Sequence, residues 1–590
     1  MARVRSRDQE AAQVSMGNIV YLIMRRMRTP LLVLISTYAV AMAGMVLIPA
    51  QDAAGHPVPY NFFHAFYFVS YMSTTIGFGE LPENFTDAQR IWVSLMIFAS
   101  VAVWLYAIGT LIRLLQDVSL QRAIRERRFR RRVRRLRDPF YLVCGHGQTG
   151  DALVRTLTDR HEHAVVIDID EARINQLKLD DHREYVPALC ADARHPRALE
   201  AAGLQHPLCK GVVALTNVNE SNLKIAIAAK LMHPDIRVIC RADSHDVEAN
   251  MASFGTDHIY DPFDTFAMDL AIAIEAPCLA LLSNWLSGFE GEPLDVPIFP
   301  PRDGRWVLCG YGRFGKAIYR HLNEQGLSLT VIEARPERTG MPKDGVIHGR
   351  GTEAVTLEQA GIHEAVGLVA GTDNDADNLS IIMTALELNP TLFVVARQNH
   401  KHNQILFERV GAQVVMIPSS IIADRIRVRL GVPLLSEFLT HARFEDETWA
   451  CELVSRIAGL VEEQVPHVWE IQVDEHHTPA LYRASQEGVG LTIAHLVSDS
   501  YDRDSVLPAI VLMRRHGETR ELLPDAQARL RMGDHLLLCG ALAVRHRMDW
   551  TLQDPNVLDY VLTGNTRPGG WIWRWLAQRG RGEPNPRANS

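Results

Sequence analysis

Two glycine-rich runs in the sequence carry the residue types that hold phosphate groups. "CGHGQTG" and "CGYGRFG" share the spacing G-x-G-x-x-G, and each follows a short apolar run. An acid stands 18 residues after the last glycine in both, Asp168 in the first copy and Glu333 in the second. The glycines are Gly145, Gly147 and Gly150, then Gly310, Gly312 and Gly315, with every pair 165 positions apart. One such run is a weak indication, but two in the same context predict a duplicated nucleotide-binding βαβ unit.

The chemistry expected of these runs is nucleotide binding. Glycines allow a tight turn and let backbone amides approach a pyrophosphate, while the N-terminus of the following helix adds partial positive charge. Asp168 and Glu333 can accept hydrogen bonds from ribose hydroxyls, and an acid there disfavours a 2′-phosphate. NAD(H), ATP, ADP or AMP therefore fit better than NADP. For each copy, and more so for the first, the alternative is a fold that no longer binds a ligand.

A third glycine-bearing run, Thr74–Glu80, lies between two long apolar segments. Pro30–Ile48 and Ile91–Ile112 hold 19 and 22 residues without a charge, and a helix of about 20 apolar residues crosses a bilayer. A cleaved signal peptide ending near "AMAG" is an alternative for the first segment. Its long arginine-bearing leader and the second apolar segment both argue against that alternative.

Arginine placement orients these two spans. Six arginines precede the first span, ten lie between Arg122 and Arg137, and no Lys or Arg occurs from Pro49 to Gln89. Both termini are therefore expected in the cytoplasm, with the protein in the cell inner (plasma) membrane. Asn61–Ser73 is too short to span and suits a re-entrant half-helix. The irregular run after it, Thr74–Glu80, is then expected to line a pore.

"TTIGFGE" resembles the potassium-channel signature, commonly T-T-V-G-Y-G-D. The resemblance implies a homotetramer in which backbone carbonyls and the Thr75 hydroxyl replace the water of a dehydrated K⁺. Gly77 would take left-handed dihedrals without penalty, and Glu80 would form an acidic ring at the outer mouth. Phe78 lacks a hydroxyl that braces many filters, which leaves the K⁺/Na⁺ selectivity open. A glycine-rich turn is the alternative. The expected selectivity filter comprises Thr74, Thr75, Ile76, Gly77, Phe78, Gly79 and Glu80.

Gly109, in the second span, stands where related channels have a small residue near the inner gate. Helix packing is the alternative, since small residues are favoured there too. Neither span carries arginine at every third residue, so no voltage sensor is expected.

After Asp138 the chain resembles the RCK (TrkA-N) domains that regulate potassium conductance and that occur in Trk and Ktr uptake subunits. The glycine runs carry the resemblance, together with "ADARHPRALEAAGL" and its counterpart "GRGTEAVTLEQAGI". It implies that Arg313 reaches nucleotide phosphates, where the first copy has Gln148. It also implies that Asp192 matches a Gly-Asp-Ala turn, where the second copy has Arg350. Different ligands or affinities are therefore expected in the two copies.

The fold class expected from these resemblances is a membrane α-helical pore, with two spans and a re-entrant pore helix, joined to two Rossmann-like α/β RCK domains. The second RCK domain should carry a small α+β, TrkA-C-like lobe. The expected function is a ligand-gated, two-span prokaryotic potassium channel. The expected divisions are 1–29 (N-terminal segment), 30–116 (pore domain with spans 30–48 and 91–115, pore helix 61–73 and filter 74–80), 117–138 (basic linker), 139–295 (first RCK domain), 303–445 (second), 446–545 (lobe) and 546–590 (tail).

Several weaker signals remain. The eight cysteines show no C-x-x-C pair and are read as reduced cytosolic thiols. Metal ligands are conceivable at Asp474–His477 and at His400 with His402, although solvated loops are the more ordinary interpretation, and a divalent regulatory cation stays open. Arg241 and Arg397 replace glutamates of calcium-gated relatives, so that calcium site is expected to be missing.

Two other functions fit the sequence less well than a channel does. A membrane-anchored NAD-dependent oxidoreductase would leave "TTIGFGE" unexplained and would lack an acid/base pair. A subunit of an uptake system would not need its own filter. The basic block after the second span suits a juxtamembrane linker beside anionic lipid better than a nucleic-acid site. The sequence does not decide whether the tryptophans of the tail, Trp571, Trp573 and Trp575, pack or touch the membrane.

Overall fold

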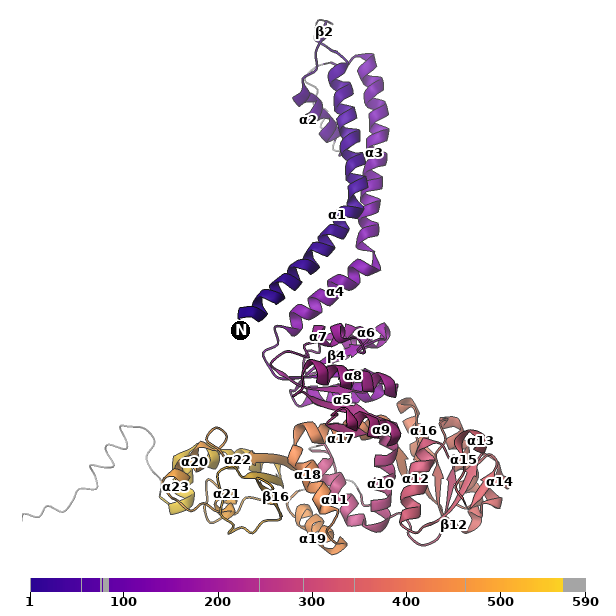
Figure 1. Cartoon of the computed structure of the whole chain (residues 1–590), viewed down its shortest axis with the longest axis vertical. Coiled ribbons are helices and arrows are strands. Elements are labelled where there is room, and N and C mark those ends of the chain that lie inside the picture. Colours follow the sequence, from indigo (N-terminus) through magenta and orange to yellow (C-terminus); the bar gives the residue numbers. More distant parts are fainter. Residues whose placement is uncertain are drawn as a thin grey trace, which may run out of the picture. The chain divides into compact units, whose positions relative to one another are not determined.

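The structure is a computed structural model in two units, Met1–Arg135 and Leu136–Ser590, and each unit is described by itself (Figure 1). It describes residues 2–52, 54, 56–74, 77, 84–243, 245–289, 291–294, 296–343, 345–461 and 463–565. For residues 2–23, 118, 119 and 245 it describes the backbone alone.

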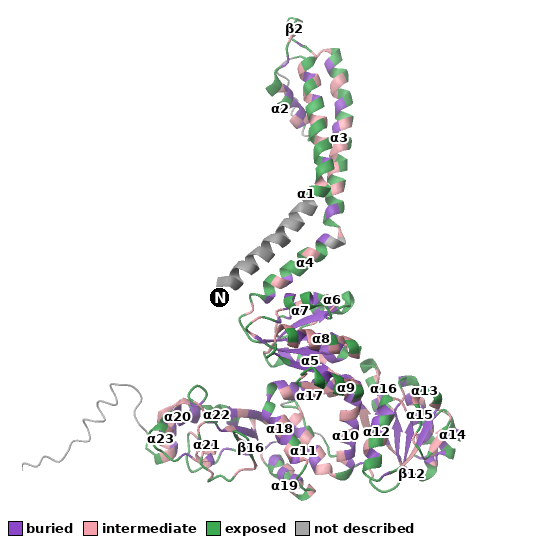
Figure 2. Ribbon diagram, viewed as in Figure 1, coloured by how far each residue is buried: buried purple, intermediate pink, exposed green. Residues whose placement is uncertain are grey.

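The first unit is built from two long helices with a short one between them. They are α1 (Ala2–Leu47), α2 (Phe62–Ser73) and α3 (Asp87–Leu115), and a hairpin of β1 (Ala50–Gln51) and β2 (Pro57–Val58) precedes α2. Met24–Leu47 and Asp87–Leu115 are long and apolar enough to cross a membrane. Figure 2 shows their surfaces largely exposed, which suits helices whose neighbours are lipid or other copies.

Two helices of this unit include segments outside the expected spans. The helix of the first span runs through Pro30 without a break and starts far earlier, at Ala2. The expected basic linker folds largely as a helix, α4 (Val118–Val133). Proline costs a helix one hydrogen bond but does not forbid it, and arginine is a good helix former.

Close packing holds α1 against α3. The indole Nε1 of Trp92 donates to the Ala41 carbonyl oxygen (3.2 Å), and Gln89 Nε2 donates to the Ile48 carbonyl oxygen (2.9 Å). A Cβ on Gly44 would lie 2.1 Å from the Trp92 ring. Glycine at this position therefore lets the two helices approach, as small residues do in membrane helix pairs.

The second unit contains two six-stranded parallel sheets of the same topology. Their strand orders are β5-β4-β3-β6-β7-β8 and β11-β10-β9-β12-β13-β14, the doubly wound nucleotide-binding order. Both central strands, β3 ("FYLVC") and β9 ("RWVLC"), are buried almost throughout, as strands covered on both faces must be. The strands are β3 (Phe140–Cys144), β4 (His163–Asp168), β5 (Ala188–Cys190), β6 (Cys209–Ala214), β7 (Arg237–Arg241), β8 (His258–Tyr260), β9 (Arg305–Cys309), β10 (Ser328–Glu333), β11 (Val346–His348), β12 (Ala365–Ala370), β13 (Phe393–Arg397) and β14 (Val414–Met416).

Helices cover both sheets. Those of the first copy are α5 (Gln148–Asp159), α6 (Glu171–Leu179), α7 (Pro196–Ala201), α8 (Asn219–Met232) and α9 (His245–Ser253). Those of the second are α12 (Arg313–Glu324), α13 (Pro336–Thr339), α14 (Ala354–Gln359), α15 (Asp375–Leu388) and α16 (Gln404–Arg409).

The two copies exchange the helices that follow their last strands. Helix α10 (Pro262–Glu275) follows the first sheet but packs in the core of the second copy, where Phe263, Phe266 and Leu270 meet Trp306 and Phe314. Helix α17 (Pro418–Gly431) follows the second sheet and packs in the core of the first copy, next to α5. The exchange ties the two TrkA-N-like halves into one body.

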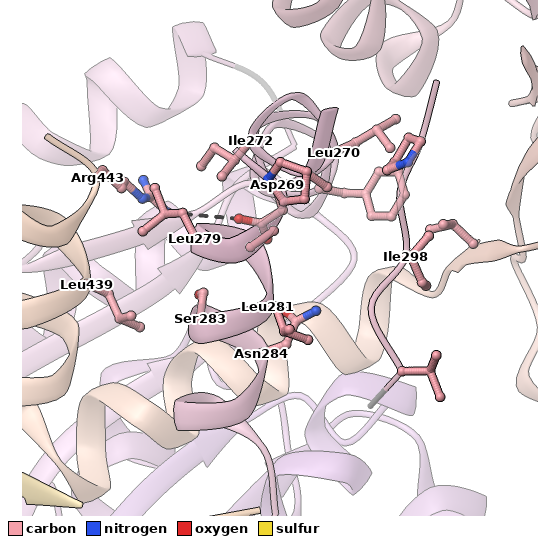
Figure 3. Close-up of a pocket in the computed structure, with 17 residues that line it drawn as sticks. Asp269, Leu270, Ile272, Leu279, Leu281, Ser283, Asn284, Ile298, Leu439 and Arg443 are labelled. Atoms are coloured by element: carbon pink, nitrogen blue, oxygen red, sulfur yellow. Dashed lines mark ion pairs between the residues drawn. The ribbon is translucent and has the colours of Figure 1, made fainter. Parts of the chain in front are cut away.

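Each exchanged helix ends before a proline that starts a further helix. Helix α11 (Pro277–Ser287) follows α10, and α18 (Pro433–Ala442) follows α17. Proline disfavours helical dihedrals in the residue before it, so the chain turns at Ala276 and at Val432. A cavity of about 520 Å³ lies where α10 meets α11, with Val296, Ile298 and Pro300 on its other side. Figure 3 shows Asp269 turned toward Arg443 at the edge of this cavity.

An antiparallel lobe closes the chain. Its strands pair in the order β15-β18-β16-β17, with bounds His467–Gln472 (β15), Ala509–His516 (β16), Thr519–Leu522 (β17) and His535–Gly540 (β18). The helices are α19 (Glu447–Ala458), α20 (Pro479–Gln486), α21 (Ile493–Val497), α22 (Leu542–Gln553) and α23 (Pro555–Thr563). Met548 and Leu558 pack in its core, so the lobe continues past the expected end at 545. The tail tryptophans lie outside the described residues.

One expectation about the cysteines is wrong. Cys278 in α11 and Cys451 in α19 form a disulfide, with their Cα atoms 5.0 Å apart. The two residues are 173 positions apart in the sequence, and only the packing of α11 on α19 brings them together. The remaining six cysteines are free thiols, as expected.

Candidate functional site

The short helix α2 is held at both ends and along one face. The Asn61 side chain accepts from the Phe63 amide (3.2 Å) and caps the first turn. Its buried face includes Ala65, Phe68 and Tyr71, which pack in one core with residues of α1 and α3. The sequence expectation of a half-helix over 61–73 matches this element to within one residue.

The run after α2 has a left-handed glycine where the filter motif needs one. Gly77 has φ +64°, and its amide donates to the Tyr71 carbonyl oxygen (3.5 Å). A residue with a Cβ is strained at such a φ. Of the expected filter, the structure describes Thr74, the C-cap of α2, and Gly77. The other five positions lie outside the described residues: Thr75, Ile76, Phe78, Gly79 and Glu80.

Gly109 lies within α3 and faces solvent in the single chain. A Cβ built there meets nothing within 4 Å. Helix packing inside the chain therefore does not explain this glycine, and its role near a gate stays a prediction.

The first glycine run forms the turn that its sequence predicts. Gly145 has φ +102° directly after β3, and Gly147 is the N-cap of α5. A Cβ on Gly150 would lie 2.1 Å from the Gly145 carbonyl oxygen, so only glycine fits. Asp168, at the end of β4, is buried and accepts from the amides of His146 (2.5 Å) and Asp170 (2.7 Å). The acid thus shapes the turn, and a carboxylate has further lone pairs for a ribose hydroxyl.

The second glycine run repeats this geometry. Gly310 has φ +96°, Gly312 is the N-cap of α12, and a Cβ on Gly315 would lie 2.0 Å from the Gly310 carbonyl oxygen. Glu333 is buried and accepts from the amides of Tyr311 (2.6 Å) and Arg335 (2.8 Å). Both copies therefore keep a glycine turn, a helix N-terminus and an acid at the edge where a doubly wound fold binds its ligand.

Arg313 makes a contact that the sequence did not predict. Its Nη1 donates to Oδ2 of Asp243 (2.6 Å), a buried residue that follows β7 of the other copy. Arg241 Nε donates to the second oxygen of Asp243 (3.0 Å). The guanidinium groups of Arg313 and Arg397 both lie over the Phe263 ring, at 5.4 and 4.8 Å from its centroid. The arginine expected to reach phosphate thus also links the two copies.

Burial shifts the pKa values of two charged side chains at this junction. Burial is the main cause that lowers the pKa of Arg397 to about 10, and the nearby positive charge of Arg313 contributes to this lowering. The Nε of Arg397 is buried and has no hydrogen-bond partner. Burial raises the pKa of Asp261 to about 6, against the two amides at the start of α10 that it caps. Arg313 and Arg241 both donate to Asp243, so an anion that binds here would compete with this carboxylate for two guanidinium groups.

Asp192 and Arg350 occupy the matching turns of the two copies. Asp192 accepts from the Arg194 side chain (2.6 Å to Nη2) and from its amide (2.9 Å). The side-chain bond is the main cause that lowers the pKa of Asp192. Arg350 follows β11 and is exposed. Asp192 is thus already paired, whereas Arg350 offers an open cation at the second copy.

Within the part of the chain that the structure describes, neither expected metal position forms a close set of three ligand atoms. Asp474 accepts from the amides of His476 (2.9 Å) and His477 (2.6 Å) and shapes a turn. His400 and His402 stack on each other with ring centroids 5.4 Å apart. Among the described residues, close sets of three ligand atoms occur instead at Cys278, Glu447 and Cys451 and at His146, Asp151 and Asp180.

Family comparisons identify both parts of the chain. The ion-channel model matches residues 31–117, and the TrkA-N domain model matches residues 141–262 and 306–418. Potassium channel protein 1 of Methanocaldococcus jannaschii is 24% identical over 233 residues, which cover 39% of this chain and 68% of that protein. The chain thus joins an ion-channel part to two TrkA-N domains, which supports a potassium channel with RCK domains. These matches indicate a channel protein rather than an NAD-dependent oxidoreductase.

Other members and structures resemble this RCK channel in part. Probable potassium channel protein 2 of the same organism is 32% identical over 152 residues, which cover 24% of this chain and 44% of that protein. Two structures of the GsuK channel, one of them bound to NAD, cover 90% and 91% of the chain at 15% identity, with TM-scores of 0.47 and 0.44.

Sequence reasoning missed one residue of the RCK junction, Asp243. The sequence offers only one indication of it. "RAD" at the end of β7 corresponds to "RQN" at the end of β13, so the first copy has an acid where the second has Asn399. The importance of that difference depends on the exchange of α10, which brings the first copy to the glycine run of the second.

Proposed function

We propose that four copies of the chain assemble around one axis into a potassium-selective pore. The observation that carries the proposal is the left-handed Gly77, placed after a capped half-helix between two spans and within "TTIGFGE". Alternating dihedrals turn successive carbonyl oxygens toward one axis, where they replace the water of K⁺. The large apolar surfaces that α1 and α3 leave exposed, such as Leu95 and Phe98, suit contact with lipid and with neighbouring copies.

A flux assay tests the pore. Purified protein in liposomes should take up Rb⁺ or K⁺ down a gradient and admit much less Na⁺. Cross-linking and mass measurement in detergent should give four chains. Absence of K⁺ flux with every nucleotide and divalent ion tried, or an assembly with no four-fold axis, would overturn the proposal.

The second part of the proposal is that a nucleotide, NAD or an adenine nucleotide, biases the opening of this pore. Its phosphates would lie on the glycine turns, with Asp168 or Glu333 on the ribose. At the second copy the phosphates would compete with Asp243 for Arg313, so binding would loosen the junction between the copies. A shift from mostly closed to mostly open takes about 5.5 kcal/mol. Four equivalent sites then supply about 1.4 kcal/mol each, or tenfold in affinity per site.

Single-channel recording in planar bilayers tests this regulation. NAD, ADP and ATP added to the side that holds the RCK domains should change the open probability, and the same ligands on the other side should not. A divalent cation is the second class of ligand to try. Reporter fusions at both ends should place the termini in the cytoplasm and the protein in the inner membrane.

A further inference from the structure

Three side chains from separate elements bring ligand atoms together beside the first glycine run. His146 follows Gly145, Asp151 lies in the first turn of α5, and Asp180 is the C-cap of α6. One imidazole nitrogen and one oxygen of each carboxylate all lie within 4.8 Å of one another. Nε2 of His146 is 4.0 Å from Oδ1 of Asp151, which is too long for a hydrogen bond and leaves room for an ion between them.

The imidazole at the centre of this group is buried and short of partners. His146 is 5% exposed, and its Nδ1 has no hydrogen-bond partner. His182, in the loop after α6, also has a buried Nε2 without a hydrogen-bond partner. Buried polar atoms are normally bonded, so both rings lack a usual partner, and Nε2 is the nitrogen of His146 that faces Asp151.

The guanidinium group of Arg155 already lies beside both carboxylates. Arg155 places Nε 3.2 Å from Oδ1 of Asp151 and Nη2 3.4 Å from Oδ2 of Asp180. Its side chain is 48% exposed, so it can turn to solvent when an ion takes those oxygens. Gln176 Nε2 donates to the other oxygen of Asp180 (2.8 Å), which orients that carboxylate as the outer partners of metal ligands do.

The second copy supplies an internal comparison. The positions of His146 and Asp151 are Tyr311 and Lys316 there, and the Lys316 ammonium lies 5.8 Å from the centroid of the Tyr311 ring. The segment that holds Asp180 is also longer in the first copy, because paired residues lie at 166 and 188 in one and at 331 and 346 in the other. The second copy thus has a lysine where the first has the Asp151 carboxylate and a tyrosine where the first has the His146 imidazole.

We propose that the first TrkA-N domain binds one divalent cation of the zinc type through His146, Asp151 and Asp180. Imidazole with carboxylates is a donor set for Zn²⁺ and similar first-row ions, whereas Ca²⁺ and Mg²⁺ prefer oxygen ligands alone. The ion ties the glycine turn to α5 and α6. The His146 amide also bonds Asp168, so the ion stiffens the place where the first copy would hold a ribose. The site does not depend on nucleotide binding.

Titration of the metal-free, full-length protein in detergent with Co²⁺ alone tests the site. We expect visible absorption bands that saturate at one ion per chain and are removed by Zn²⁺. The double variant His146→Tyr with Asp151→Lys copies the pair that the second copy already packs. It should weaken Co²⁺ binding at least as much as the about 10–100-fold that loss of an outer partner costs. Arg155→Gln should strengthen binding, because it removes the competing cation.

Two control variants separate this site from other donors. His400→Gln with His402→Gln, and Cys278→Ser with Cys451→Ser, should leave the bands and the stoichiometry unchanged. Asp180→Asn serves if the double variant does not fold, and it should lower the affinity too. The proposal is overturned if no bands appear, if the double variant or Asp180→Asn binds Co²⁺ like the wild type, or if the bands vanish only in a control.

Discussion

The contact between Arg313 and Asp243 gives the sharpest test of how the RCK domains act. Asp243→Asn keeps the size of the side chain and removes the charge that accepts from Arg313 Nη1 (2.6 Å) and Arg241 Nε (3.0 Å). If phosphates compete with Asp243 for Arg313, then losing this carboxylate should favour the bound state. We therefore expect Asp243→Asn to bind ADP or NAD more tightly than the wild type at the second copy.

The exposure of the Arg313 side chain sets the size of the expected change in nucleotide affinity. The Arg313 side chain is 57% exposed, so solvent screens the pair and its worth is about 1 kcal/mol. That free energy corresponds to about fivefold in the dissociation constant. Over four subunits it sums to about 4 kcal/mol, which approaches the about 5.5 kcal/mol that switches a two-state gate. The open probability of Asp243→Asn should accordingly respond at lower nucleotide concentration.

Calorimetry on the purified protein measures the affinity, and thermal unfolding with and without ADP gives a second readout. Removing a carboxylate from three guanidinium groups should lower the melting temperature without ligand, and bound phosphate should restore more of it than in the wild type. Asp246→Asn is the matched control, because Asp246 is exposed, lies three residues away and carries the same charge. Equal nucleotide affinity in Asp243→Asn and wild type, or weaker binding, would refute competition for Arg313.

Three further predictions concern single side chains. Gly77→Ala should abolish K⁺ flux while the protein still assembles, since φ +64° costs a residue with a Cβ about 1–2 kcal/mol in every subunit; normal flux would contradict the filter geometry. Gly315→Ala should remove nucleotide binding from the second copy, because its Cβ would lie 2.0 Å from the Gly310 carbonyl oxygen. Gly459→Ala, with ordinary contacts beyond 3.5 Å, should bind as wild type in the same calorimetric assay. Asp261→Asn should raise the melting temperature at pH 7 but not at pH 4. The pKa of Asp261 is raised from 3.8 to about 6 in the folded protein, so the folded state binds more protons than the unfolded state between these pH values. The stability of the wild type therefore falls as the pH rises through about 4 to 6. A pH-independent effect would mean that the charge is not the cause.

The elements and turns of this channel follow from local sequence. Apolar length predicts the spans, and the short run before Thr74 predicts α2, because both depend on chain length against bilayer thickness. The glycines of the two runs also follow locally, since Gly145 and Gly310 need positive φ and Gly150 and Gly315 need to touch the turn before them. The acids Asp168 and Glu333 lie at the predicted strand ends for the same reason, a fixed number of residues in a fixed βαβ unit.

Contacts between distant segments were decided only by the tertiary structure. Nothing in the amphipathic patterns of α10 and α17 says which copy each helix covers, because both cores present similar apolar surfaces. Once they cross over, Asp243 reaches Arg313, Cys278 reaches Cys451, and the phosphate-directed arginine becomes part of a junction. The spacing of apolar residues indicates which face of a helix is buried. It does not indicate which element packs against that face, because that depends on the path of the chain through the whole tertiary structure.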